Sequence, residues 1–201
     1  MTLKVFFTIV CASISNLLVG QTVEIGIKGG LNLSDIVITN FTNPDAESMY
    51  QTKTGMHAGI FAAVGLYDNF NLLGELLYSN RGVRTTERID LHYVTMPILM
   101  SYKLTEKFSI EGGPEIGYLA SAKANADNVT NTWNNKLDIG VNLGAVYKLS
   151  EKIGLNARYY AGFSSVIDGV NEQHLNFIPT EETIKYQNRV LQLAIYYIVF
   201  D

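Results

Sequence analysis

The sequence is poor in the residues that usually identify a function. Only one cysteine and one tryptophan occur in 201 residues, and only 17% of the residues are charged. The formal net charge of −4 offers no basic surface for nucleic acid, so we expect no nucleic-acid partner. No run of about 18 consecutive apolar residues is present, which excludes a predicted membrane-spanning helix.

The first twenty residues have the pattern of a secretory signal peptide. Lys4 supplies a positive start, residues 5–12 form a short apolar run, and Gly20 is a small residue before Gln21. We predict cleavage after Gly20; the alternative is a buried N-terminal strand or helix. Cleavage would remove Cys11 and leave residues 21–201 as one domain with neither a disulfide nor a thiol nucleophile.

What the chain has in abundance is strict alternation of apolar and polar residues. Within residues 23–34, Val23, Ile25 and Ile27 share one parity with two later leucines, and polar residues and glycines occupy the other. Successive side chains of a strand point to opposite faces, so this segment predicts a strand with one apolar face. The pattern predicts eight strands, at residues 23–34, 55–67, 70–81, 91–104, 108–120, 137–149, 153–163 and 189–200.

Two prolines lie inside these predicted strands. Pro97 falls in the fourth and Pro114 in the fifth, where proline removes a hydrogen-bond donor from the ladder. The alternation continues on both sides of each proline, so we keep both strands and expect a bulge or a strand end there.

Short and long connections alternate strictly along the chain. The short polar ones are residues 68–69, 105–107 and 150–152, and the long ones are 35–54, 82–90, 121–136 and 164–188. In an antiparallel up-and-down barrel, this order places all tight turns at one end and all long loops at the other. Outer-membrane barrels have this arrangement, with short periplasmic turns and longer outer loops.

The two parities indicate which face meets lipid. The polar parity collects charges of both signs: Glu24, Lys28, Glu75, Arg81, Lys103, Glu111, Glu115, Asp138, Lys148 and Arg158. The apolar parity carries tyrosines near strand ends, which suits a membrane–water boundary: Tyr78, Tyr102, Tyr118, Tyr147, Tyr159 and Tyr197. We therefore expect the charges to pair inside the barrel and the apolar face to contact lipid. The alternative is a soluble, lipocalin-like barrel with an inner ligand cavity.

The inward parity also predicts a plugged lumen. An eight-stranded barrel has an interior that side chains just fill, and large residues share this parity: Phe61, Leu73, Leu77, Tyr93, Leu99, Val146 and Tyr160. Glu111 and Glu115 are separated by about 13 Å between Cα atoms along one strand, so they do not suit a paired acid–base role. We expect each to pair with a basic residue such as Lys103, Lys148 or Arg158.

No motif carries catalysis, a cofactor or a metal. The three histidines, His57, His92 and His174, lack the close spacing of helical metal sites, and we expect His57 to form hydrogen bonds in the lumen. The residue types of a serine–histidine–acid set occur near the predicted outer rim, at Ser79, Ser164, Ser165, His92, His174, Asp90 and Asp168. Nothing in the sequence joins them, so we predict no catalytic residue, no cofactor and no metal site.

Several segments, in their order and spacing, resemble the PorT-type outer-membrane β-barrel family. The similar segments are residues 26–34, 75–82, 93–99, 112–117 and 190–193. The resemblance implies an outer-membrane barrel without shared catalytic residues. Such barrels usually finish on an aromatic residue, which resembles the signal read by the barrel-insertion machinery, whereas here Phe200 is followed by Asp201.

We therefore predict a small bacterial outer-membrane barrel with a structural or loop-mediated interaction role. The expected partners are outer-membrane lipid, the barrel-assembly machinery during insertion, and envelope or secretion proteins bound through the outer loops. Loop 164–188 is unusually apolar, and we expect it to fold over the barrel mouth or to contact a partner. The alternatives are a component of a protein-export apparatus, which the resemblance suggests, and a lipid-modifying outer-membrane enzyme.

Overall fold

The computed structural model describes residues 22–39, 51–84, 88–125, 127–130, 135–165 and 185–201. The predicted signal peptide at residues 1–20 lies outside these residues. The strands are β1 (Val23–Thr39), β2 (Gln51–Tyr67), β3 (Phe70–Arg84), β4 (Arg88–Lys103), β5 (Phe108–Ala124), β6 (Asp127–Asn128), β7 (Leu137–Lys148), β8 (Ile153–Gly162) and β9 (Lys185–Phe200). Among the described residues, no helix has the length and apolar character needed to cross a membrane.

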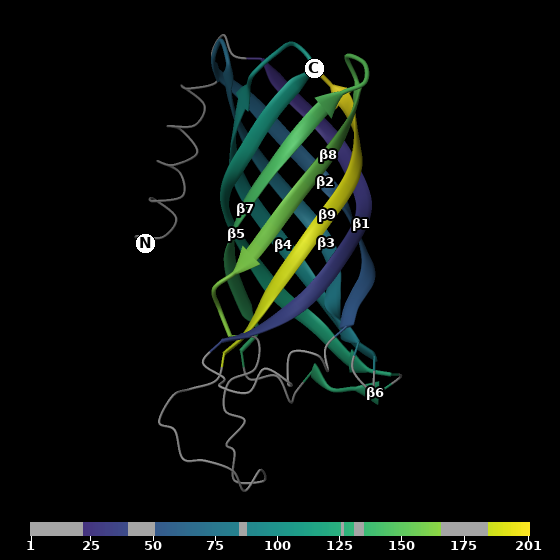
Figure 1. Ribbon diagram of the computed structural model, residues 1–201. Helices are drawn as coiled ribbons and strands as arrows, with labels where there is room; N and C mark the ends of the chain where they lie inside the picture. Colours follow the sequence, from purple (N-terminus) through teal and green to yellow (C-terminus); the bar gives the residue numbers. More distant parts are fainter. Residues whose placement is uncertain (1–21, 40–50, 85–87, 126, 131–134, 166–184) are drawn as a thin grey trace, which may run out of the picture.

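All strands except the two-residue β6 form one closed antiparallel barrel. The order around the wall is β4-β3-β2-β1-β9-β8-β7-β5, and pairing of β4 with β5 closes the ring. Each strand therefore lies beside its neighbour in sequence, and β1 pairs with β9 to join the two ends of the domain. The tight turns and the C-terminus lie at one end, and β6 lies at the other (Figure 1). The predicted eight-stranded up-and-down barrel is confirmed.

Six of the eight barrel strands are longer than predicted at the loop-side end. β1, β3 and β5 continue to Thr39, Arg84 and Ala124, and β2, β4 and β9 begin earlier than the alternation indicated. The prediction ended each strand where apolar alternation stops, but ladder hydrogen bonds connect backbone groups whatever the side chains are. Asp35 of β1, for example, still pairs with Arg189 of β9. The predicted turn-side ends are correct to within one residue.

Neither strand proline is at a bulge. Pro97 is in register with Glu115, and Pro114 is in register with Val141. Proline removes one donor that points to one neighbouring strand, so the residues on either side hold the register. The register shifts lie elsewhere, between Ile25 and Gly26, Thr52 and His57, Gly65 and Tyr67, and His92 and Tyr93. The expected bulge or strand end at the prolines is therefore wrong.

The apolar parity faces outward, as predicted. Ile27, Ile60 and Leu143 are 53%, 55% and 71% exposed, whereas Arg81 and Arg158 are 0% and 1% exposed in the lumen. This distribution is the reverse of a soluble barrel and suits a wall surrounded by lipid. The lipocalin-like alternative is therefore wrong.

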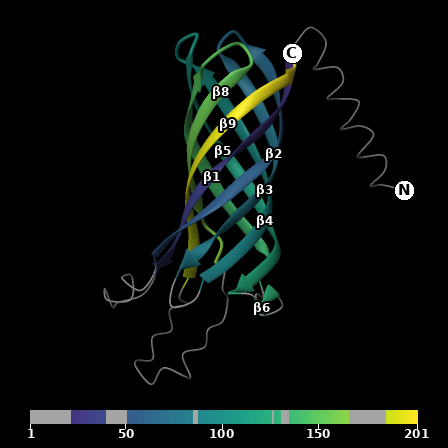
Figure 2. The ribbon, with the colours of Figure 1, turned by 90° about the vertical axis from the view of Figure 1, so that its right-hand side faces the viewer.

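The outward apolar band occupies only part of each strand. On β4 it runs from Tyr102 to Val94, about the nine residues that a tilted strand needs to cross a membrane. Outward positions beyond it include the polar residues His92, Asp35 and Arg189. We call these strand ends, beyond Val94 and its neighbours, the loop-side collar. Figure 2 shows the strands continuing together toward that end.

Candidate functional site

The middle of the lumen is crossed by an arginine that binds two carboxylates from other strands. Arg158 of β8 donates to Glu75 of β3 at 2.8 and 2.9 Å, and to Glu111 of β5 at 2.6 and 2.8 Å. Lys28 of β1 donates to Glu75 at 3.1 Å, and Asn156 donates to Glu111 at 2.8 Å. We call these five residues the Arg158 cluster. It connects four strands across the interior.

The Arg158 cluster balances its own charge. Lys28 and Arg158 carry two positive charges, and Glu75 and Glu111 carry two negative charges. All four side chains are almost completely buried. Buried charges require this kind of pairing, because removal of one partner leaves the other charge uncompensated in a medium of low dielectric constant.

A second buried arginine lies in the lumen nearer the loops. Arg81 of β3 forms ion pairs with Glu115 of β5 and, at 3.3 Å, with Asp138 of β7. Its guanidinium lies over the ring of Tyr160, 4.3 Å from the centroid, and 5.5 Å from the centroid of Tyr93. Asn142 and Asn188 complete this Arg81 cluster, donating to Glu115 at 2.9 Å and to Asp138 at 2.8 Å. Beyond it, Leu91, Tyr93, Leu119 and Ala122 form an apolar layer.

The predicted partner is correct for one of the two glutamates and wrong for the other. Glu111 binds Arg158, as expected, but Glu115 binds Arg81, which was not among its proposed partners. Lys103 and Lys148 lie nearer the turn-side end than either glutamate, and among the described residues neither lysine is in an ion pair. The alternation predicts that all these side chains point inward, but it does not predict their positions along the barrel axis.

His57 is a lumen hydrogen-bonding residue, as predicted. Its Nδ1 lies 2.8 Å from Oδ1 of Asn32, and the side chain is 1% exposed. Asn32 also donates to the Ser79 hydroxyl at 3.0 Å, and Arg81 donates to the same hydroxyl at 3.2 Å. Ser79 therefore serves as a buried link between two polar groups of the lumen.

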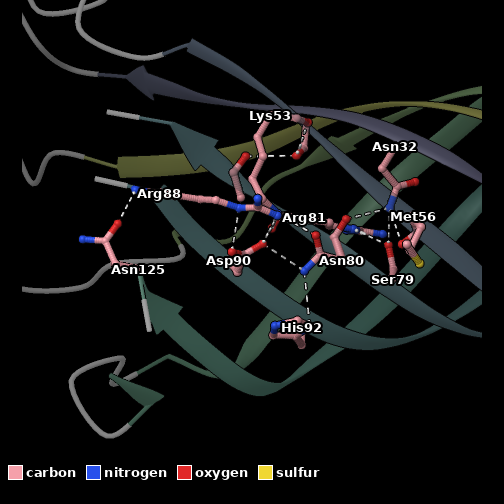
Figure 3. Close-up of polar contacts among 12 residues, drawn as sticks. Asn32, Lys53, Met56, Ser79, Asn80, Arg81, Arg88, Asp90, His92 and Asn125 are labelled. Atoms are coloured by element: carbon pink, nitrogen blue, oxygen red, sulfur yellow. Dashed lines mark hydrogen bonds and ion pairs between the residues drawn. The ribbon is translucent and has the colours of Figure 1, made fainter. Parts of the chain in front are cut away.

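The collar contains a polar group where β2 separates from β3. Ladder pairing between these strands is interrupted from Thr52 to His57. Side chains of β1 donate hydrogen bonds to the β3 carbonyl groups there. Asn32 donates to the Asn80 carbonyl and Ser34 to the Gly82 carbonyl, each at 2.9 Å. These contacts seal the wall at the break (Figure 3).

Lys53 joins this seal to an acidic residue of β4. Its Nζ donates to Oδ1 of Asn80 at 2.6 Å and to the Arg81 carbonyl at 3.0 Å, and it forms an ion pair with Asp90 at 2.6 Å (Figure 3). Arg88 binds the same carboxylate at 2.9 Å. Burial alone would raise the pKa of Asp90, but hydrogen bonds from Lys53 and Arg88 lower it below its usual value. Burial has the opposite effect on the cation Lys53 and lowers its pKa.

His92 lies on the outside of the collar, apart from Ser79. Its Nδ1 is 2.5 Å from the Tyr78 hydroxyl and 3.2 Å from Nδ2 of Asn80, and its ring stacks on Tyr78 at 5.9 Å between centroids. Ser79 points into the lumen, so the structure does not assemble the serine, histidine and acid of the enzyme alternative from these residues.

The remaining candidates that the structure describes add no site. Ser164 accepts a hydrogen bond from the Ile139 amide at 3.0 Å, and the Ser165 carbonyl accepts one from Asn135 at 2.9 Å. Asp168 and His174 lie outside the described residues, as does most of loop 164–188. Within the described part of the chain, no group of three His, Cys, Asp or Glu side chains is arranged to hold a metal ion.

Comparisons with known proteins agree with this architecture. A family profile described as "Outer membrane protein beta-barrel domain" matches residues 16–168. Neisserial surface protein A has a similar structure, with a TM-score of 0.55 and 8% sequence identity, over 86% of this chain and 96% of that chain. Ail of Yersinia pestis (TM-score 0.48, 12% identity, 87% and 98% coverage) and OprG of Pseudomonas aeruginosa (0.46, 14%, 90% and 98%) are also similar. A search of curated protein sequences gave no match.

Proposed function

Because the chain belongs to the outer membrane protein β-barrel domain family, we propose that it is a non-conducting barrel that acts through its outer surface. It is a small barrel of the bacterial outer membrane, and its strands fix a direction in that membrane. Short turns of such barrels face the periplasm and long loops face outward. The loop-side collar therefore lies outside the cell, where it can support an interaction with another envelope component.

One observation carries the non-conducting part of the proposal. Arg158 reaches across the lumen to Glu75 and Glu111, and a second cluster around Arg81 lies between it and the loops. An ion that crossed would have to displace buried, mutually paired charges, which costs several kcal/mol for each uncompensated group. General porin conductance is therefore not expected.

The interaction part rests on the collar and on the sequence of loop 164–188. Lys53, Asn80 and Asp90 bind one another across β2, β3 and β4, so the collar is a firm base for the loops. The loop sequence carries apolar residues that a solvated loop would not need: Val166, Ile167, Val170, Leu175, Phe177, Ile178 and Ile184. We propose that this loop provides the contact with a partner in the envelope.

Planar-bilayer recording tests the first part. Purified barrel, shown to be folded by its heat-modifiable gel mobility, should give no large stable current steps under conditions in which an open porin does. Stable steps from the wild-type chain would refute the plugged lumen.

Deletion of residues 174–183 tests the second part. The shortened chain should keep its heat-modifiable mobility, because β8 ends at Gly162 and β9 begins at Lys185, and should lose recovery of its envelope partner after crosslinking. Unchanged recovery together with unchanged protease protection of the loop would refute a loop-mediated contact.

Protein export is a second candidate, supported by the motif resemblance to PorT-type barrels. Under this proposal the chain would co-purify with a secretion complex, and a strain that lacks it would retain export substrates. We also propose that the barrel-assembly machinery recognises Phe200 and Tyr197. Both side chains are exposed on the outward face of β9.

A further inference from the structure

The turn-side end of the lumen contains a cavity of about 70 Å³. Its floor is formed by Lys28, Glu75, Glu111 and Asn156 of the Arg158 cluster. Its walls carry Glu24, Lys103, Ser109 and Lys148, together with the apolar side chains of Phe61, Leu73, Val146 and Tyr196. We call this cavity the turn-side vestibule. Because short turns face the periplasm, it is accessible from that compartment.

Two lysines lie on the same side of the vestibule. Lys103 of β4 pairs in register with Ser109 of β5, which pairs with Val146 of β7, two residues before Lys148. Both lysines are half-buried. Neither ammonium has a hydrogen-bond or ion-pair partner among the residues that the structure describes. The two cations therefore flank the Ser109 hydroxyl and face a common space.

The vestibule has an excess of positive charge. The four charges of the Arg158 cluster cancel, as described above for Lys28, Arg158, Glu75 and Glu111. Above them remain Lys103 and Lys148 and a single carboxylate, Glu24 of β1. In this eight-stranded ring, β1 lies four strands away from β5, so Glu24 stands on the opposite wall from the lysines. One bound monovalent anion would balance the remaining charge.

We propose that the turn-side vestibule binds the carboxylate or phosphate group of a small periplasmic molecule between Lys103 and Lys148. This site is separate from the outer surface to which the previous section assigns the function. Charges between protein walls are screened less than in water, which strengthens their attraction for an oxyanion. The Ser109 hydroxyl is a third donor, and Glu24 faces the opposite side of the ligand, where an ammonium group of the same molecule would fit.

The size of the vestibule limits what enters it. In this measure of cavity volume, about 10–15 Å³ is enough for one water molecule, so a cavity of about 70 Å³ accommodates a carboxylate or phosphate group. The rest of a larger ligand would extend through the turn-side opening. The floor prevents further passage, so the vestibule is a binding site rather than the mouth of a channel.

Anion titration of the folded barrel tests this proposal. Amide NMR shifts are followed in detergent micelles while sodium phosphate or sodium acetate replaces sodium chloride at constant ionic strength. We expect saturable shifts at Lys103, Ser109 and Lys148. Lys103→Gln and Lys148→Gln should each weaken binding about tenfold, the usual effect of losing one charge-assisted hydrogen bond. Lys148→Arg should retain binding, and the matched control Lys123→Gln, exposed at the loop end, should leave it unchanged.

The two anions distinguish the natural source. Saturation by phosphate alone supports a phosphate ester as the ligand, and saturation by acetate supports a carboxylate-bearing molecule. Shifts that grow without saturation, or that persist in a folded Lys103→Gln/Lys148→Gln double variant, would show that no site exists and overturn the proposal. Heat-modifiable mobility reports whether each variant is folded.

Discussion

Replacement of Arg158 by methionine should destabilise the barrel strongly. The substitution removes the cation that binds Glu75 and Glu111 and leaves Lys28 as the only positive charge in the cluster. Removal of one member of a buried ion pair costs about 3–5 kcal/mol, because the remaining charge is left without compensation. Here Lys28 still binds Glu75 at 3.1 Å, so the uncompensated group is Glu111. We therefore expect a loss of about 3–5 kcal/mol in the free energy of unfolding.

Urea titration of the folded barrel in lipid vesicles measures this loss, with heat-modifiable gel mobility as the probe. Lys148→Met is the matched control, because that lysine is inward-facing but has no ion-pair partner among the described residues, and it should change the free energy by less than about 1 kcal/mol. Arg158→Lys keeps the charge but loses the fork that binds two carboxylates, so its effect should be intermediate.

A second arm separates charge imbalance from lost packing. The triple variant Arg158→Met/Glu75→Gln/Glu111→Gln removes the buried carboxylates along with the guanidinium and should recover part of the stability lost by Arg158→Met. Two results would refute the reasoning about charge balance. One is an equal free energy of unfolding for Arg158→Met and Lys148→Met. The other is a triple variant that is less stable than Arg158→Met by the summed losses of Glu75→Gln and Glu111→Gln measured alone.

Two further predictions concern the collar. Because Asp90 has a lowered pKa in the folded state, it stabilises the barrel above its ordinary pKa of 3.8 and loses that effect as the pH falls through the folded value. Asp90→Asn should therefore be less stable than wild type at pH 7 and approach it below pH 3.8 in urea titrations; a pH-independent difference would contradict this. Gly82 has φ of 134°, and a Cβ there would overlap the Ile89 carbonyl oxygen. Gly82→Ala should lower the urea midpoint, with a loss of about 1–3 kcal/mol in the free energy of unfolding. Gly74→Ala should change the midpoint little, because no atom lies within 4 Å of the added Cβ. Equal midpoints for the two variants would show that the Gly82 conformation is not required.

The alternation of apolar and polar residues was enough to predict the strands of the barrel wall, because the side chains that contact lipid recur there at every second residue. A strand surrounded by lipid must present an apolar residue at every second position, so a shift of β8 by one residue would place Arg158 in the membrane. The same alternation predicted the inward side chains that are now seen to be buried, such as Phe61 and Leu99. Turn-side strand ends were predicted to within one residue because polar turns interrupt the pattern there.

The partners within the lumen depend on information that the alternation does not contain. Parity places Arg81, Lys103, Lys148 and Arg158 inside, but the stagger of the strands decides which of them share a level with Glu115. The interval from Glu115 to Lys103 along their paired strands spans several residues, whereas Arg81 lies close enough to bind directly. Prediction of the pairs requires the register of every strand between them.

The collar was missed for a different reason. Lys53 lies in a segment that was predicted to be loop, because the residues around it are polar and break the alternation. Outside the membrane, a strand has no need of an apolar face, and its stability comes from ladder pairing and from side chains such as Lys53, Asn80 and Asp90 that bind one another. The physical requirement changes at the level of Tyr78 and Val94, from apolar contact with lipid to polar contact within the protein. A pattern set by lipid must therefore end at that level even though the strands continue.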